Sequence, residues 1–144
     1  MSARAPGHGA ERRARELLRS VAGPEAAAMY EELGFVGVEP AGEDRYGYLV
    51  YPHRPVVAYD AAAGELLSEY CVRFPDPVAS DVGGRLPDAD DVLAKWIGLR
   101  ADEHMLLAAA NMDVPGRQMD PALVRRDRDT LRRWRAERTP EVPA

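Results

Sequence analysis

The feature that most constrains the fold is a stretch rich in β-branched and aromatic residues, from Arg45 to Phe74. Such residues favour strands because they pack well on a pleated, half-buried surface. Two turn signals divide the stretch: residues 52–55 carry two prolines, and residues 60–64 begin with aspartate and end with glycine. The pattern therefore predicts three consecutive antiparallel strands, over residues 46–51, 56–59 and 65–74.

Alternation of side chains predicts two unlike faces for the third strand. The face that we expect to pack on helices is mostly apolar and holds Leu66, Ser68, Tyr70, Val72 and Phe74. The face that we expect to meet solvent carries three charges and holds Glu65, Leu67, Glu69, Cys71 and Arg73. This difference predicts helices on one side of the sheet.

Helical signals precede the predicted strands. Apolar residues at helical spacing predict a helix over residues 10–21. A proline at the first position and a glycine just past the end predict a second helix over residues 24–33. Between this helix and the first strand, residues 35–38 have the composition of a short edge strand.

Further helical signals follow the strands. Acidic residues open a predicted helix over 87–100 and another from residue 102, and an Asp-Pro pair starts a last helix over 121–137. The predicted fold class is therefore α+β, a three- to four-stranded antiparallel meander with helices packed on one face. The last helix is expected to be peripheral.

Length and composition predict a single domain over residues 10–138, between a disordered stretch at 1–9 and a loose tail at 139–144. No apolar run approaches the roughly 20 residues that a membrane span needs. The N-terminus lacks the apolar segment of a secretory signal, and the single cysteine cannot form an internal disulfide. These features predict a cytoplasmic protein that does not contact a membrane.

The net charge of −5 conceals an uneven distribution. Residues 21–119 hold seven basic and seventeen acidic side chains, whereas residues 120–144 hold seven arginines and five acids. The acidic body argues against binding of nucleic acid by the main domain, because affinity for phosphate comes from lysine and arginine. One lysine stands against eighteen arginines, a composition typical of GC-rich bacterial or phage genomes.

A series of short motifs follows the predicted hairpin. The motifs are Tyr70-Cys71-Val72, the segment LPDADDVLAK from Leu86 to Lys95, Asp102-Glu103, Leu106 and Ala110-Asn111. Over residues 45–112 they resemble a group of short bacterial and phage proteins of no known activity. The resemblance therefore implies no functional residue, and the arginine-rich last helix is not a feature of that group.

Catalytic and metal-binding patterns are weak. Cys71 would need a nearby base to act as a nucleophile, and nothing in the sequence brings His53 or His104 to it; a lone cysteine in a strand is more often a buried apolar residue. A small enzyme that uses Cys71 or the acids near Asp90 stays an alternative hypothesis. We assign no catalytic residue and no cofactor.

The acidic residues that come closest to metal-ligand spacing are Asp88, Asp90 and Asp91. Their position at a helix start already explains them by capping and by the helix dipole, and we assign no metal. His104 with Asp102 and Glu103 is a similarly weak cluster. The sequence also lacks a glycine-rich phosphate-binding motif.

Five tyrosines lie on the predicted strands, at positions 46, 48, 51, 59 and 70. On an exposed sheet face they would stack bases, while His53 and Arg54 at the hairpin tip would contact phosphates. The alternative is that the tyrosines pair across strands and fill the core. The acidic body favours this second interpretation.

The strongest surface candidate is the arginine-rich segment from Val124 to Arg138. Three interpretations stay open: it docks on the acidic middle of its own chain, binds a protein, or binds nucleic acid. The leading hypothesis is a non-enzymatic interaction or accessory module that contacts an acidic partner, with self-association as one form of that contact. Nucleic-acid binding through residues 124–138 is the alternative. The candidate binding residues are Arg125, Arg126, Arg128, Arg132, Arg133, Trp134, His53 and Arg54.

Overall fold

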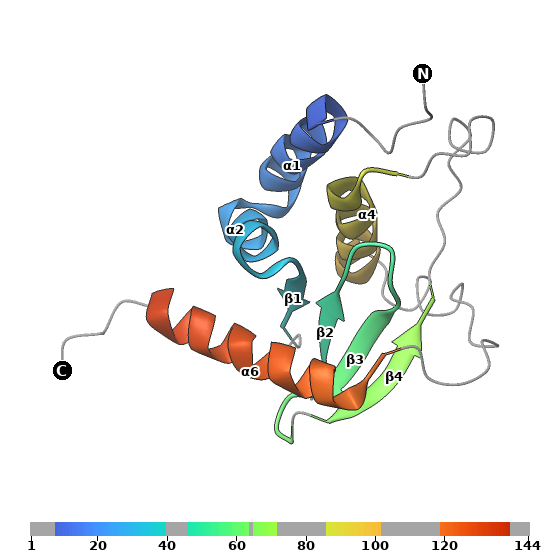
Figure 1. The fold of residues 1–144 in the computed structure, drawn as a ribbon, viewed down its shortest axis with the longest axis vertical. Coiled ribbons are helices and arrows are strands. Elements are labelled where there is room, and N and C mark those ends of the chain that lie inside the picture. The colour runs from blue at the N-terminus through green and yellow to red at the C-terminus, as the bar shows by residue number, and fades with distance from the viewer. Residues whose placement is uncertain (1–7, 40–45, 64, 72–85, 102–118, 139–144) are drawn as a thin grey trace.

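The computed structural model describes residues 8–39, 46–63, 65–71, 86–101 and 119–138. The elements, in chain order, are α1 (His8–Ala22), α2 (Pro24–Leu33), β1 (Val36–Val38), β2 (Tyr46–Val50), β3 (Val56–Asp60), β4 (Leu66–Tyr70), α4 (Asp88–Ala101) and α6 (Pro121–Arg138) (Figure 1). The described part of the chain thus has a four-stranded sheet with helices packed on it. The predicted α+β class is confirmed.

The strands form an antiparallel meander in the order β1-β2-β3-β4. In this register Gly37 pairs with Leu49, which in turn pairs with Val57. The turn between β3 and β4 forms as predicted, because Asp60 Oδ1 accepts hydrogen bonds from the backbone of Ala62 and Ala63 at 2.8 and 2.9 Å.

A β-bulge in β4 changes which side chains lie on each face of this strand, compared with the prediction. The register shifts between Ala58↔Ser68 and Tyr59↔Leu66, so Leu67 is the extra residue. Leu66 therefore lies on the opposite face from Ser68, not on the same face as predicted. The described strand ends earlier than predicted, at Tyr70, and residues 72–74 lie outside the described residues.

The helix boundaries lie within a few residues of the predicted ones. α1 begins at His8, so the predicted disordered stretch is too long by two residues; the acidic Glu11 in the first turn favours this early start. α2 has the expected proline at its start, and its end is capped by Gly34 in the left-handed conformation. The predicted helix from residue 102 and the tail at 139–144 lie outside the described residues.

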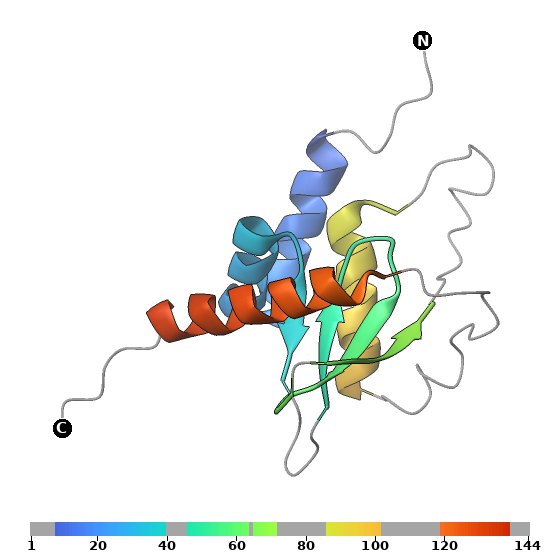
Figure 2. The ribbon, with the colours of Figure 1, turned by 60° about the horizontal axis from the view of Figure 1, so that its bottom comes forward.

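The helices cover both faces of the sheet. α1, α2 and α4 lie on one face, as predicted, and α6 crosses the opposite face (Figures 1 and 2). Leu131 of α6 packs against Gly37, on the face that Leu49 and Val57 share with this glycine. The side chains of Leu49, Val57, Val124 and Leu131 are almost fully buried, so the second face also carries a core layer.

Glu11 joins three helices on the first face. Its Oε1 accepts the Ala89 backbone N–H at 3.0 Å at the start of α4, and its Oε2 accepts bonds from Arg15 Nε at 2.7 Å and Tyr30 Oη at 3.1 Å. Burial alone would raise the pKa of Glu11, but the bonds from Ala89 and Arg15 outweigh it and hold that pKa below its ordinary value. Glu11 thus caps α4 from a distant part of the chain.

Candidate functional site

α6 has two faces of different character. The inner face, directed at the sheet, holds the buried residues Val124, Asp127, Arg128, Leu131 and Trp134. The outer face of α6 comprises the exposed residues Ala122, Arg125, Arg126, Asp129, Arg132, Arg133, Ala136 and Glu137. Both sets recur every three to four residues, so each forms a continuous stripe along the helix.

The inner face docks α6 on its own domain. Tyr51 Oη donates a 2.8 Å hydrogen bond to Asp127 Oδ2, and Trp134 Nε1 donates to Glu32 Oε2 at 3.3 Å. Burial and the bond to Asp127 raise the pKa of Tyr51. Trp134, which the sequence suggested as a binding residue, therefore lies against the core and anchors the helix.

Three arginines on the inner side have partners within the domain. Arg128 is buried and donates to the carbonyl of Ala61 at 3.1 Å. Arg135 donates to the Gly37 carbonyl at 3.4 Å, and burial lowers the pKa of this guanidinium. Arg138 lies 3.2 Å from Glu32 and 4.4 Å from the centre of the Trp134 ring. These contacts explain nearly half of the arginines of α6 as structural.

The other four arginines are exposed on the outer face of α6. Arg126, whose side chain is 69% exposed, lies 3.4 Å from Asp127. Within the part of the chain that the structure describes, Arg125, Arg132 and Arg133 have no ion-pair partner. A shallow hollow of about 410 Å³ is lined by Asp129, Arg132, Arg133 and Ala136. The face therefore presents exposed guanidinium groups, whose donors suit carboxylates or phosphates.

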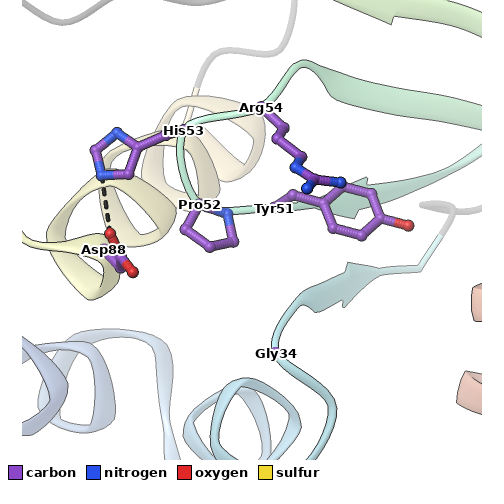
Figure 3. A pocket seen from close by; sticks show the side chains of 6 residues that line it. All are labelled: Gly34, Tyr51, Pro52, His53, Arg54 and Asp88. Atoms are coloured by element: carbon purple, nitrogen blue, oxygen red, sulfur yellow. Dashed lines mark ion pairs between the residues drawn. The ribbon is translucent and has the colours of Figure 1, made fainter. Parts of the chain in front are cut away.

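His53 and Arg54 lie on a separate surface, in the turn between β2 and β3 next to the start of α4 (Figure 3). His53 has a φ of 57°, in the left-handed region that side chains rarely adopt. Its Nε2 is buried 3.1 Å from Asp88 Oδ1, in a contact that is not aligned as a hydrogen bond. The candidate residues thus fall into two groups rather than one site.

A buried ion pair, which the sequence analysis missed, fixes this turn. Lys95 is the only lysine of the chain and is 1% exposed. Its ammonium group donates to the carbonyls of Tyr51 and Arg54 at 3.0 and 2.9 Å and to Asp91 Oδ2 at 2.5 Å. The same carboxylate oxygen accepts the His53 backbone N–H at 2.8 Å. The sequence signal for this ion pair is the spacing of Asp91 and Lys95, which lie four residues apart on one helix.

The remaining candidates are not assembled into a site. Cys71 is half-buried after β4, while the His53 imidazole is directed at α4, and His104 lies outside the described residues. Among the described residues, no group of three or more histidine, cysteine or acidic side chains is arranged to hold a metal. Of the strand tyrosines, Tyr48, Tyr51 and Tyr59 are buried and Tyr70 is half-buried, so they form core rather than a stacking surface; only Tyr46 is exposed.

Comparison with models of protein families, with curated proteins and with solved structures finds no match to this chain. The resemblance to short bacterial and phage proteins therefore stays a prediction. None of the described helices is both long enough and apolar enough to cross a membrane.

Proposed function

We propose that the protein is a small interaction module that binds an acidic segment of a partner protein through the outer face of α6. The observation that carries the proposal is the division of the arginines. Arg128, Arg135 and Arg138 have partners inside the domain, whereas Arg125, Arg132 and Arg133 have no ion-pair partner among the described residues. Anchoring of the inner face fixes the backbone positions from which the exposed arginines project, so the helix itself need not be ordered on binding.

The charge pattern of the outer face favours a protein over nucleic acid. Asp129 lies between the pair Arg125–Arg126 and the pair Arg132–Arg133, so an acidic group occupies the centre of the basic row. A phosphate backbone would be repelled at this point, whereas a protein segment can place a basic side chain opposite Asp129. The net charge of −5 also weakens attraction to a polyanion at long range.

The partner can be a second copy of the chain, because the described surface also carries exposed acids such as Glu16, Glu31 and Glu65. We also propose that the protein is cytoplasmic, on the grounds of its single cysteine. We also retain the proposal of a bacterial or phage origin and of kinship with the short proteins that its motifs resemble.

Site-directed photo-crosslinking in the source cell tests the proposed function. A photoreactive amino acid at Ala136, beside Arg132 and Arg133 in the hollow, is expected to crosslink an acidic protein. The same group at Ala62, an exposed residue of the β3–β4 turn, serves as the control. A crosslink to nucleic acid from position 136, or equal protein crosslinking from both positions, would contradict the proposal.

A matched pair of triple variants links the crosslink to the arginines. One variant replaces Arg125, Arg132 and Arg133 by alanine; the other replaces Arg12, Arg13 and Arg19, three exposed arginines of α1. Both lose the same formal charge. The α6 variant should lose the crosslink from position 136 and the α1 variant should keep it, whereas equal losses would attribute the effect to net charge alone.

A further inference from the structure

A cleft of about 440 Å³ lies between the β2–β3 turn, the end of α2 and the start of α4, away from the outer face of α6 (Figure 3). It is lined by Gly34, Tyr51, Pro52, His53, Arg54 and Asp88. Its volume is in the range of small-molecule sites, which run from about 300 to 1,000 Å³. Side chains of opposite charge, Arg54 and Asp88, lie on different sides of Pro52 in Figure 3.

The turn that forms one wall of the cleft is held rigidly. Lys95 binds the carbonyls on both sides of it, at Tyr51 and Arg54, and Asp91 binds the backbone N–H between them. These hydrogen bonds come from the protein interior, and they satisfy two carbonyl groups and one N–H group of the turn. The cleft is therefore pre-formed by buried contacts and does not need to be organised by a ligand.

The same bonds hold His53 in an unfavourable conformation. A left-handed φ is unfavourable for a non-glycine residue, and glycine would be the favourable residue at this position. The histidine places its imidazole over Asp88, with Nε2 3.1 Å from the carboxylate. Strained residues of this kind concentrate at binding sites, where the surrounding contacts keep them in place. Here the strained residue places its imidazole beside an acidic group at the edge of the cleft.

The other charged group of the cleft is available to a ligand. Arg54 is exposed, and its guanidinium has no ion-pair partner in the described parts of the chain. Its planar donors suit a carboxylate, and the charge of Asp88, whose side chain is 48% exposed, attracts an ammonium group. Pro52, which lies between those charges in Figure 3, offers apolar surface to whatever joins them.

We propose that this cleft is a binding site for a small zwitterion whose carboxylate and ammonium groups are separated by an apolar spacer. Arg54 binds the carboxylate, Asp88 binds the ammonium group, and the spacer lies against Pro52. His53 is a positioning residue, because it acts on the ligand through Asp88. This site is independent of the interaction through α6.

Titration of the isotope-labelled full chain, followed by backbone amide NMR shifts, tests the site. The zwitterionic probes are L-alanine, γ-aminobutyrate and ε-aminocaproate, which differ in the spacing of their charges; hexanoate and hexylamine each lack one charge. At least one zwitterion should shift the amides of Gly34, His53 and Arg54 and bind about tenfold more tightly than both singly charged probes, a difference of about 1.4 kcal/mol. Absence of shifts, shifts elsewhere, or equal binding of a singly charged probe would overturn the proposal.

Variants assign each charge. Arg54→Gln should reduce the affinity of the zwitterion to that of hexylamine, and Asp88→Asn should reduce it to that of hexanoate. His53→Asn keeps a residue type that tolerates positive φ, so it should weaken binding of hexylamine but not of hexanoate. Arg12→Gln and Glu31→Gln, at exposed positions of α1 and α2, are the matched controls and should change nothing. If the control substitutions weaken binding as much as Arg54→Gln and Asp88→Asn do, the cleft is not the binding site and the proposal is overturned.

Discussion

Leu131 of α6 lies directly on Gly37 of β1, and a β-carbon at position 37 would overlap the Leu131 side chain. The glycine is thus required for space. The close approach also brings Arg135 to the Gly37 carbonyl, while Met29 Sδ accepts the Gly37 N–H at 3.4 Å. β1 is an edge strand, so these contacts satisfy backbone groups that would otherwise be open to pairing with another chain.

Replacement of Gly37 by alanine should destabilise the domain by about 1–3 kcal/mol, the usual effect of overpacking a core. Urea unfolding measures the change. The same substitution in a Leu131→Ala background should have a smaller effect, because the truncated side chain leaves room for the new methyl group. Equal losses in both backgrounds would show that α6 does not pack on β1 in solution.

Replacement of Lys95 by methionine should destabilise the protein by about 3–5 kcal/mol, because it leaves the buried Asp91 carboxylate without its ammonium partner. The double variant Lys95→Met with Asp91→Asn removes this uncompensated charge and should be more stable than Lys95→Met alone. Thermal and urea unfolding compare them. A double variant no more stable than the single one would contradict the assignment of Asp91 as the partner.

Replacement of Glu11 by glutamine should cost about 1–2 kcal/mol at neutral pH, because Glu11 caps α4 and binds Arg15. The pKa of Glu11 is lower in the folded protein than its ordinary value of 4.5, so its charge stabilises the fold above that pH. This contribution is lost as pH falls through the folded pKa. Unfolding measured from pH 7 downwards should therefore show the two proteins converge in stability; a constant difference would contradict the account.

Neighbouring arginines of α6 should differ in their effect on stability. Arg128→Ala removes a buried side chain and the hydrogen bond to Ala61, and should cost about 1–3 kcal/mol. Arg125→Ala, one turn earlier on the outer face, should stay within about 0.5 kcal/mol of the parent protein. Urea unfolding of the two variants, side by side, checks the division of the helix. Equal losses would place Arg125 in the structural set.

Most of the architecture follows from local sequence signals. The proline and glycine turns delimit the strands, and residues such as Pro24, Gly34 and Asp120 mark helix ends by the chemistry of their caps. Leu131 and Trp134 lie at helical spacing on the inner face of α6. These signals act within a few residues of chain, so the sequence displays them directly.

The contacts that the sequence did not reveal join residues far apart. Tyr51 and Asp127 are 76 positions apart, and Glu11 and Ala89 are 78 apart. The bulge at Leu67 was also missed, since strict alternation was assumed for the whole strand. In the sequence Lys95 stands out only as the single lysine and as the end of the LPDADDVLAK segment, because burial of a lysine becomes visible only once its three acceptors are placed around it.

The central claim is that the outer face of α6 binds an acidic protein. The most direct measurement is the affinity of the crosslinked protein, once purified, for the parent chain and for the two triple variants at low and high salt. The α6 variant lacking Arg125, Arg132 and Arg133 should bind about ten- to a hundredfold more weakly, as the loss of three exposed ion pairs predicts, and the α1 variant should bind normally. Equal affinity of the α6 variant and the parent chain would contradict the claim.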